Sequence, residues 1–396
     1  MGLDMKNSLE SQLKELLSED ISSVINREKS TFDRLVAPFG ESFVLFGAGN
    51  LGRKILAGLR SVGIEPLAFA DNNPRLWNSS VDRLQVLSPQ DATHNFGRRA
   101  AFVVTIWSPG HRFAYTRQQL LDLNCLRVVS FVSLLWKYPE TLLPHYCLDL
   151  PHKIYEQVDD VRKALSLWAD DASRREYLAQ LKWRLLPDSD GLPSPVAQEE
   201  YFPDTLFSLS PNEVFVDCGA FNGDTIRSFL RRQGSSFGNV IALEPDPANF
   251  QELQEYLSTL DSNIKDKVTA LQLAVAAHKE KARFQATGTL ESAITDTGTL
   301  EVDCAPLDEI LGNCVPTYIK MDIEGAEPDA LAGACRVIKQ TSPVLAVCVY
   351  HRQDHLWRLP LFIKSLSSQY RFFLRPHDEE GWQLVCYAVP VDRLTA

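Results

Sequence analysis

Hydrophobic positions along the chain follow two spacings, and the change between them comes near residue 39. Across residues 1–38, leucine, isoleucine and valine recur at intervals of three and four, starting with Leu9, Leu13 and Leu16. This interval places the apolar side chains on one face of a helix. We therefore predict an amphipathic N-terminal helix over residues 1–38, which packs on its own chain or forms the contact of a homodimer.

Residues 39–150 alternate between short apolar runs and helical patterns. The apolar runs are typical of buried strands, and a helical segment separates the first two. The runs are FVLF, PLAFAD, AAFVVTIW and RVVSF, and the helical segment is RKILAGLRSVG. A strand–helix alternation of this kind predicts a small Rossmann-like α/β domain with a parallel sheet.

A second strand–helix alternation begins at EVFVDCGA and continues almost to the end of the chain. Between the two alternations lies a helical pattern that includes Val161, Leu165 and Trp168, followed by the loop PDSDGLPSP. Proline, glycine and aspartate cluster in loops. We predict a helical connector and loop over residues 151–208, followed by a larger α/β domain over residues 209–396.

Charge and composition restrict the partners of the protein more than its fold. The 396 residues carry a formal net charge of −11, which disfavours nucleic acid or an anionic membrane surface as the main partner. No apolar run has the length of a membrane span, and the first residues lack the apolar core of a signal peptide. The 8 cysteines show no C-x-x-C spacing, so we expect them to be reduced and the protein to be cytoplasmic.

The segment VFVDCGAFNGDT joins a buried strand to a helix through a glycine turn. We expect the strand to end at Asp217 and the helix to begin near Asp224, with Gly219, Ala220 and Gly223 in the turn. Glycine lets a backbone approach a ligand closely, and a helix N-terminus offers unpaired N–H groups. The turn predicts a cofactor site, although dinucleotide sites use a similar turn.

The next strand, VIALEPDP, ends in Glu244, about 20 residues after the glycine turn. A carboxylate at this separation binds the hydroxyl groups of a cofactor ribose. A solvated strand-end residue is the alternative. We expect a third strand, VTALQLAVA, to end near the adenine, where Ala274 and Val275 would form apolar walls.

Acidic residues gather after a further strand, in the segment TYIKMDIEGAEPDAL. Asp322, Glu324 and Glu327 come at a strand-to-helix turn, and ligands of open parallel sheets bind beyond the carboxyl ends of the strands. Three neighbouring carboxylates require a cation, a protonated partner or hydrogen bonds. The sulfonium of S-adenosylmethionine is one such cation, and a structural ion network is the alternative.

The segments DCGAFNGDT, ALEPDP and IKMDIEGAE resemble those of the FkbM-type S-adenosylmethionine-dependent methyltransferases. The resemblance implies a doubly wound, Rossmann-like sheet of seven strands with a reversed last strand at WQLVCYAVP. The roles that it implies are the cofactor turn for Asp217, Gly219 and Gly223, the ribose contact for Glu244, and the acidic turn beside the reacting methyl group for Asp322 and Glu324. The full set of residues that we expect at the S-adenosylmethionine is Asp217, Gly219, Ala220, Gly223, Asp224, Glu244, Ala274, Val275 and Asp322.

Methyl transfer to an oxygen needs an aligned nucleophile and a group that removes its proton. The strand VLAVCVY is followed by HRQDH, which places His351 beside the acidic turn. His351, Asp322 and Glu324 are therefore the catalytic candidates, and a structural role for the histidine is the alternative. We expect no metal, since a divalent metal held by these three residues is chemically allowed but less favoured.

The N-terminal α/β domain carries a glycine turn of its own. GAGNLG places Gly47, Gly49 and Gly52 in a G-x-G-x-x-G pattern between a strand and a helix, and Asp71 ends the next strand. The domain resembles the N-terminal nucleotide-binding domains of sugar-modifying acyltransferases. The resemblance implies a nucleotide or nucleotide-sugar ligand, and a purely structural domain is the alternative.

These features predict an S-adenosylmethionine-dependent O-methyltransferase that acts on a hydroxyl of a sugar, glycan or secondary metabolite. We expect the acceptor pocket around KARFQATGTLESAITDTGTLEVD and the connector, with Ser292 and Tyr201 lining the cleft. Two alternatives stay open. One is an NAD-dependent oxidoreductase centred on the N-terminal domain, although residues 39–150 lack a recognisable catalytic tyrosine–lysine or histidine arrangement. The other is a non-catalytic nucleotide-binding module.

Overall fold

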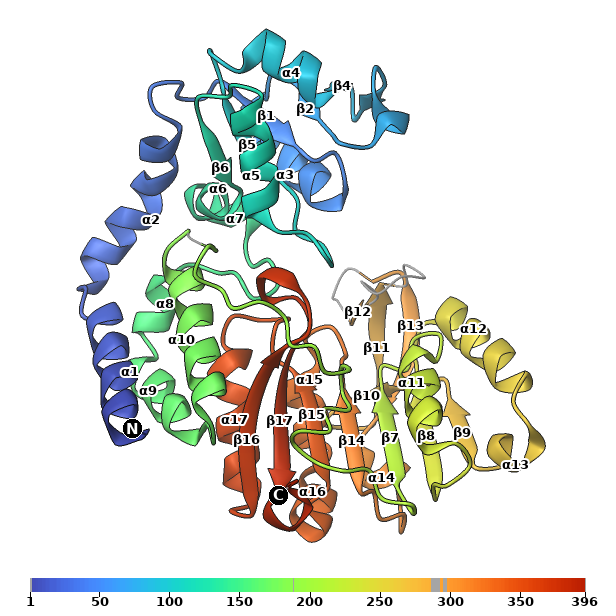
Figure 1. Ribbon diagram of the computed structural model, residues 1–396. Coiled ribbons are helices and arrows are strands. Elements are labelled where there is room, and N and C mark those ends of the chain that lie inside the picture. Colours follow the sequence, from blue (N-terminus) through green and yellow to red (C-terminus); the bar gives the residue numbers. More distant parts are fainter. Residues whose placement is uncertain (1, 188, 286–292, 295–297, 396) are drawn as a thin grey trace. The chain divides into compact units, whose positions relative to one another are not determined.

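The computed structural model describes residues 2–187, 189–285, 293–294 and 298–395 (Figure 1). The chain divides into two compact units, each assembled from separate segments. The first unit consists of Met1–Arg162, Arg175–Pro195 and Asp378–Trp382, and the second of Lys163–Arg174, Val196–His377 and Gln383–Ala396. The connector expected over residues 151–208 is thus divided between the units.

Two helices, and not one, precede the first sheet. α1 spans Gly2–Leu16 and α2 spans Ile21–Val36, so the prediction of one helix over residues 1–38 is wrong. The break has a local cause. The Asp20 side chain accepts a hydrogen bond from the Ser23 N–H at 3.0 Å, as an N-cap residue does, and a new helix starts there.

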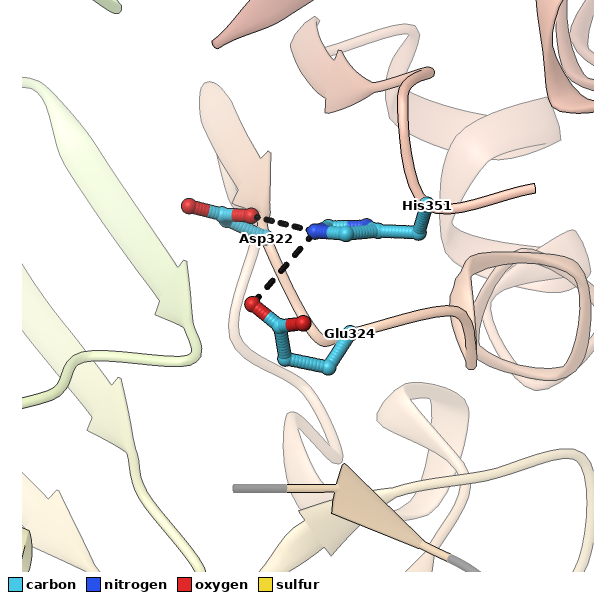
Figure 2. Close-up of side chains that lie close together, drawn as sticks. All are labelled: Asp322, Glu324 and His351. Carbon is cyan, nitrogen blue, oxygen red and sulfur yellow. Dashed lines mark ion pairs between the residues drawn. The ribbon is translucent and has the colours of Figure 1, made fainter. Parts of the chain in front are cut away.

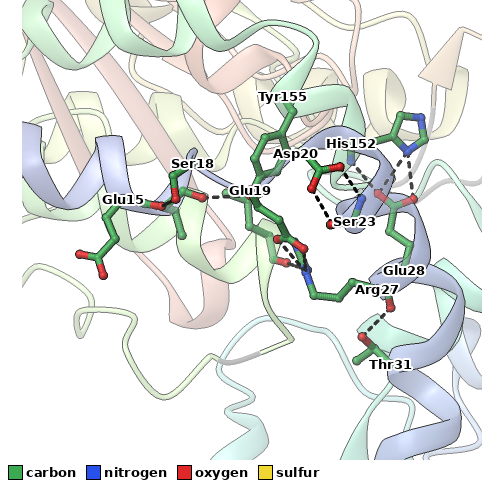
Figure 3. Close-up of polar contacts among 12 residues, drawn as sticks. Glu15, Ser18, Glu19, Asp20, Ser23, Arg27, Glu28, Thr31, His152 and Tyr155 are labelled. Carbon is green, nitrogen blue, oxygen red and sulfur yellow. Dashed lines mark hydrogen bonds and ion pairs between the residues drawn. The ribbon is translucent and has the colours of Figure 1, made fainter.

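Polar contacts attach these helices to the rest of the first unit (Figure 3). Arg27 pairs with Glu19 at 2.8 Å and donates to the carbonyl oxygen of Leu185 at 2.6 Å. Glu28 is only 2% exposed and accepts a hydrogen bond from the His152 backbone N–H at 2.6 Å. These buried contacts fit a helix pair that packs on its own chain, and the homodimer stays a prediction.

The first unit contains a sheet whose strands, within the described residues, lie in the order β3-β4-β2-β1-β5-β6. β3 runs antiparallel to β4, and the other neighbours are parallel. The strands are β1 (Phe43–Phe46), β2 (Phe69–Ala70), β3 (Ser80–Val81), β4 (Leu84–Leu87), β5 (Ala101–Val104) and β6 (Val128–Ser130). The Rossmann-like α/β fold of this part is confirmed, and the short β3–β4 hairpin is an addition to the expected strands.

The second unit is built on a larger sheet, whose order in the described part of the chain is β16-β17-β15-β14-β7-β8-β9. β17 runs antiparallel to β15 and β16, and the remaining neighbours are parallel. The strands are β7 (Val214–Cys218), β8 (Asn239–Leu243), β9 (Val268–Leu271), β14 (Tyr318–Met321), β15 (Val344–Cys348), β16 (Tyr370–Pro376) and β17 (Leu384–Pro390). The doubly wound sheet with a reversed last strand is confirmed.

The centre of this sheet fixes the position of the candidate site. The chain leaves β7 toward β8 on one side and leaves β14 toward β15 on the other, so the strand order reverses between β7 and β14. In the register of this pair, Asp217 lies opposite Lys320 and Cys218 opposite Met321. Open α/β sheets bind ligands beyond the carboxyl ends of the strands at such a reversal. Gly219 follows β7 at this edge.

The segment VTALQLAVA forms two strands in two sheets, so the prediction that Ala274 and Val275 end the third strand is wrong. β9 ends at Leu271, and β10 (Ala274–Val275) pairs with β13 (Leu300–Ala305) in a smaller sheet of order β10-β13-β11-β12 among the described residues. The other strands of this sheet are β11 (Glu280–Gln285) and β12 (Ala293–Ile294). Ala274 is buried there against Phe284 and Cys304. An apolar run does not tell how many strands it forms, because both sheets bury apolar side chains.

Helices connect and cover both large sheets. In the first unit they are α3 (Asn50–Ser61), α4 (Pro89–Phe96), α5 (Phe113–Asp122), α6 (Val132–Lys137), α7 (Pro139–Leu142) and α8 (His152–Tyr155). From the connector onward they are α9 (Val158–Leu167), α10 (Asp171–Leu185), α11 (Asp224–Gln233), α12 (Pro247–Ser258), α13 (Ser262–Lys265), α14 (Leu307–Ile310), α15 (Glu327–Ala332), α16 (Cys335–Thr341) and α17 (His355–Leu366). Among the residues described, none of these helices has the length and apolar character needed to cross a bilayer.

Candidate functional site

The glycine turn after β7 lies directly against the acidic turn after β14. Gly219 has a φ of 81°, and a Cβ atom at this position would lie 2.0 Å from the carbonyl oxygen of Asp322. Both the left-handed conformation and the close approach exclude a larger residue. Gly223, with a φ of 85°, precedes α11, which begins at Asp224 as expected. The glycine turn thus leads into the N-terminus of α11 and contacts the backbone of the acidic turn.

Asp217 supports the glycine turn from inside the sheet. Its side chain is 0% exposed and pairs with Lys320 at 3.0 Å. The Lys320 ammonium also donates to the Gly219 carbonyl oxygen at 2.6 Å. Burial raises the pKa of Asp217 to about 6, against the lowering effect of the Lys320 charge. This buried pair anchors the turn, and a direct cofactor contact of Asp217 stays a prediction.

Glu244 follows β8 immediately and ties the glycine turn to the neighbouring strand end. One carboxylate oxygen accepts the Phe221 N–H at 2.8 Å, and the other accepts the Asp246 N–H at 2.8 Å. Burial raises the pKa of Glu244 to about 7, although both backbone hydrogen bonds act in the opposite direction. Each carboxylate oxygen has a second lone pair, so the group is able to accept further hydrogen bonds.

Three expected catalytic residues come together from two neighbouring strand ends. Figure 2 shows Asp322 and Glu324 on the turn after β14, with the His351 ring pointing at both carboxylates. His351 Nε2 lies 3.3 Å from Asp322 Oδ1 and 3.5 Å from Glu324 Oε1. Glu324 has a φ of 54°, and Gly325 next to it has a φ of 104°. This uncommon backbone turns the Glu324 carboxylate toward the histidine.

The far side of His351 is held by a wholly buried carboxylate. His351 Nδ1 lies 2.8 Å from Glu327 Oε1, and the second oxygen of Glu327 lies 3.3 Å from His355 Nδ1. The Ile323 N–H also donates to Glu327, at 3.0 Å. His355 thus belongs to the support of the site.

The pKa values of this cluster follow from burial and opposite charge. Burial lowers the pKa of His351, but the charges of Glu327 and Glu324 outweigh it and raise the pKa well above its ordinary value. Burial raises the pKa of Asp322, yet the hydrogen bond with His351 and the charge of Lys320 hold it well below its usual range. For Glu324, burial wins and the pKa is raised. The cluster is therefore strongly coupled, with the cationic histidine favoured among the carboxylates.

Two tyrosine hydroxyls hold Asp322 from further positions in the chain. Tyr201 donates to Asp322 Oδ2 at 2.9 Å, and Tyr350 donates to Asp322 Oδ1 at 3.3 Å. Tyr201 is fixed in turn, because its backbone carbonyl accepts the Tyr318 hydroxyl and its N–H donates to the Tyr387 hydroxyl at 2.9 Å. Tyr201 was expected in the acceptor cleft, and it lies against an acidic residue of the candidate site.

Glu200 is the residue of this neighbourhood that sequence reasoning missed. Burial, followed by the charge of Asp322, raises its pKa to about 8. It belongs to the segment before β7, more than a hundred positions from Asp322 in the chain, and it carries no local motif. Only its place next to Tyr201, which was singled out as a lining residue, pointed to it.

The other expected residues lie elsewhere or outside the description. Ala274 and Val275 are buried in the smaller sheet and do not follow β9. The Nε2 atom of His377 lies 2.8 Å from the Tyr387 hydroxyl, and burial lowers the pKa of His377 to about 4. Ser292 lies outside the described residues, so its place at the acceptor is not addressed.

The glycine turn of the first unit is formed as the G-x-G-x-x-G pattern predicts. A Cβ atom at Gly47 would lie 2.5 Å from the Ile106 side chain, and one at Gly52 would lie 2.0 Å from the Gly47 carbonyl oxygen. Gly49 differs, because a Cβ atom there would meet nothing within 4 Å. The Asp71 carboxylate accepts the N–H of Ala48 at 2.8 Å. Packing therefore explains two of the glycines and leaves Gly49 unexplained.

Comparison with known proteins gives a family for the part of the chain that contains the glycine turn after β7 and the acidic turn after β14. Residues 217–374 match the family described as the methyltransferase FkbM domain. The matched range includes the glycine turn, Glu244, the acidic turn and His351. None of the curated proteins compared with the chain matches it.

Solved structures extend the similarity in fold to both units. A crystal structure of methyltransferase FkbM from Methylobacillus flagellatus KT is 23% identical, with 98% of this chain and 100% of that chain covered and a TM-score of 0.77. A precorrin-6y C5,15-methyltransferase from Geobacter metallireducens GS-15 is 14% identical over 46% of this chain and 83% of its own, with a TM-score of 0.30. RSP, a Rex-family repressor, is 21% identical over 23% of this chain and 44% of its own, with a TM-score of 0.20. The first of these likenesses supports the fold described above.

Proposed function

Since residues 217–374 match the methyltransferase FkbM domain, we propose that the chain is an FkbM-type methyltransferase that binds S-adenosylmethionine and methylates a hydroxyl oxygen of a sugar, glycan or secondary metabolite. The observation that carries the proposal is the contact between the two turns. A cofactor on the glycine turn would have its sulfonium close to the carboxylates of Asp322 and Glu324, because Gly219 touches the backbone of Asp322. Carboxylates stabilise such a cation.

The cofactor roles divide among the residues of the glycine turn. Glu244 takes the ribose hydroxyls with its remaining lone pairs, while Gly219, Ala220 and Gly223 let the backbone approach the ligand. Asp224 stands at the first position of α11, where a helix N-terminus favours hydrogen-bond acceptors. The methionine part of the cofactor is then directed toward the acidic turn.

The transfer itself is a displacement at the methyl carbon. The acceptor oxygen forms the O–CH₃ bond, the C–S bond breaks, and its electron pair goes to sulfur, which gives S-adenosylhomocysteine. The hydroxyl proton passes to the group formed by Asp322, Glu324 and His351. The two carboxylates reach the acceptor first, because their side chains are 23% and 16% exposed and that of His351 is 1% exposed.

Calorimetric titration of the purified protein with S-adenosylmethionine, S-adenosylhomocysteine and NAD tests the cofactor. We expect saturable binding of both S-adenosyl ligands, lost or weakened at least about tenfold in Glu244→Ala because two ribose hydrogen bonds disappear. Glu255→Ala, a change at an exposed position of α12, is the control and should bind normally. NAD binding alone, unaffected by either change, would refute the proposal and favour an oxidoreductase centred on the first unit.

A second candidate function is the binding of a nucleotide or nucleotide-sugar by the first unit. Gly49 favours it, since neither its φ of −78° nor its surroundings require glycine, and close approach of a phosphate does. Gly49→Val should therefore leave the unit folded and abolish binding of a uridine diphosphate sugar or NAD, measured by calorimetry. If the variant and the original protein give the same heats of binding, either because both bind the ligand or because neither does, this candidate function is refuted.

We also propose a cytoplasmic location and a small-molecule or glycan acceptor. None of the cysteines in the described ranges forms a disulfide, which supports a reducing compartment. The net charge of −11 supports an uncharged or cationic acceptor over nucleic acid.

A further inference from the structure

Two carboxylate oxygens and one imidazole nitrogen converge beside the glycine turn. Asp322, Glu324 and His351 each direct one oxygen or nitrogen inward, and these atoms all lie within 4.8 Å of one another (Figure 2). The two distances from His351 Nε2 are 3.3 Å and 3.5 Å. Neighbouring ligands of an octahedral cation with bonds near 2.1 Å are separated by about 3 Å. Two edges of the triangle are thus close to the edge of an octahedral face, and the third, between the two carboxylate oxygens, is at most 4.8 Å long.

The histidine is oriented as metal-binding histidines are. A metal-bound imidazole donates its second ring N–H to a carboxylate, which fixes the ring and the tautomer. His351 Nδ1 lies 2.8 Å from Glu327 Oε1, and Glu327 is 0% exposed. A proton on Nδ1 leaves the Nε2 lone pair directed between Asp322 and Glu324. Glu327 therefore orients His351 in the way that the carboxylate behind a metal-bound histidine does.

Asp322 is restrained in the same manner. The hydroxyl groups of Tyr201 and Tyr350 donate to its two oxygens at 2.9 Å and 3.3 Å. A carboxylate with both oxygens held by donors keeps its orientation when a cation arrives, which lowers the entropic cost of binding. Two of the three ligands are therefore held in place from behind by neutral or buried partners.

One side of the triangle is open. The Asp322 and Glu324 side chains are 23% and 16% exposed, whereas His351 is 1% exposed. A cation bound to the three would have protein on one side and free coordination positions on the other. Metal sites that act on substrates keep such positions open.

We propose that Asp322, Glu324 and His351 bind one divalent cation, with Mn²⁺ as the best match to two carboxylates and one imidazole. Carboxylate oxygens suit Mg²⁺ and Mn²⁺, and an imidazole nitrogen favours the later metals, so Mn²⁺ satisfies both kinds of ligand. This revises the expectation of a metal-free site. It changes no element of the fold.

The consequence for the acceptor rests on the proposed O-methyl transfer. The open positions of the cation take two adjacent oxygens of the acceptor, such as a vicinal diol of a sugar ring. With the cation bound, the three residues would be its ligands and would not accept the hydroxyl proton as they do in a metal-free site. The cation would stabilise the acceptor alkoxide, whose proton goes to water, and the oxygen lone pair would then attack the methyl carbon. An acceptor that lacks the second oxygen is expected to bind more weakly.

Electron paramagnetic resonance of Mn²⁺ tests the cation site directly. The protein is freed of metal with a chelator, the chelator is removed, and Mn²⁺ is added. We expect one Mn²⁺ to bind per chain with a Kd of about 10 µM to 100 µM, and pulsed spectra to contain coupling to an imidazole nitrogen. Glu324→Gln should weaken binding at least about tenfold, since it removes an ionised ligand of the same shape.

Glu200→Gln is the matched control, because Glu200 lies near Asp322 without belonging to the triangle, and its pKa of about 8 keeps it mostly protonated near neutral pH. Its Kd for Mn²⁺ should stay within about threefold of the original, because the change removes neither a ligand nor a full charge. The spectroscopic coupling does not depend on any variant, and thermal unfolding verifies that both variants are folded.

The opposite results are equally clear. Absence of binding up to about 1 mM Mn²⁺, binding without nitrogen coupling, or equal losses in Glu200→Gln and Glu324→Gln would overturn the cation site. His351 would then satisfy the carboxylates as an imidazolium only. S-adenosylmethionine titrated into the same metal-free protein separates the two proposals: cofactor binding without Mn²⁺ binding refutes the cation site alone, and Mn²⁺ binding without cofactor binding refutes the methyltransferase cofactor alone.

Discussion

At the scale of the residue, the proposed ribose contact of Glu244 would couple cofactor binding to pH. Its pKa of about 7 means that the carboxyl is half protonated near neutral pH, because burial disfavours the charged form. In the proposed contact, ribose hydroxyls would donate to the ionised form, so binding would first have to remove the proton from the protonated fraction. The affinity for the cofactor is therefore expected to increase as the pH rises through 7.

We expect the Kd for S-adenosylhomocysteine to be about tenfold larger at pH 6 than at pH 8. S-adenosylhomocysteine avoids the sulfonium charge, so the acidic turn contributes less to the pH profile. In Glu244→Gln the profile should become flat and the affinity low at both values. Calorimetry at the two pH values measures this, and an unchanged slope in the variant would contradict the role of Glu244.

Lys320 gives the second prediction at this scale. Lys320→Met leaves Asp217 buried without its cation, which should lower the free energy of unfolding by about 3–5 kcal/mol. The control is Lys281→Met, which removes an exposed ion pair with Glu301 and should leave the free energy nearly unchanged. Urea unfolding followed by circular dichroism compares the two. Similar losses in both variants would mean that the buried pair is no more important than a surface pair.

At the scale of the element, the contact between two turns decides whether the site forms. Gly219→Ala places a Cβ atom against the Asp322 carbonyl and forces an unfavourable φ, whereas Gly312→Ala, with a φ of 54° in open space, forces only the φ. We expect Gly312→Ala to cost about 1–2 kcal/mol and to keep cofactor binding. Gly219→Ala should cost more and abolish binding, as judged by calorimetry. Retained affinity in Gly219→Ala would show that the turns tolerate separation.

The carboxyl-terminal edge of the larger sheet could be predicted well from the sequence, since each strand there is followed directly, in the same short segment, by its glycines or its acids. VFVDCGAFNGDT and TYIKMDIEGAE contain the apolar run, the turn and the charges in order, and parallel pairing places their ends together. Local pattern fails where the partner lies far along the chain. Glu200 and Tyr201 reach Asp322 only through tertiary packing, and VTALQLAVA divides between two sheets with similar apolar cores. The break at Asp20 was missed because one capping residue interrupts an otherwise helical spacing.

At the scale of the whole molecule, each unit is completed by a distant segment. Asp378–Trp382 belongs to the first unit, where the Trp107 indole donates to the Glu380 carbonyl oxygen at 3.0 Å. The Phe113 N–H donates to the Glu380 carboxylate at 2.7 Å, and the ring centroids of Trp107 and Trp382 lie 4.3 Å apart. Aromatic packing and buried hydrogen bonds thus bind this short segment into the first unit.

Trp382→Ala is expected to destabilise the first unit by about 1–3 kcal/mol, because a partly buried indole and its ring contacts are lost. S-adenosylhomocysteine should bind the variant as it binds the original protein and should raise the unfolding temperature of the second unit in both. Differential scanning calorimetry with and without the ligand separates the two effects. A loss of ligand affinity in Trp382→Ala would contradict the independence of the site from this segment.

The return of the chain to the first unit near residue 380 also dictates an order of events during synthesis. A ribosome releases the polypeptide from its N-terminus, so the sheet of the first unit emerges early, but Glu380 and Trp382 emerge only after nearly all of the second unit. The first unit therefore lacks this segment during most of translation. For the same reason, cutting the gene between the two sheets would not yield two complete units, because the first fragment would lack Asp378–Trp382.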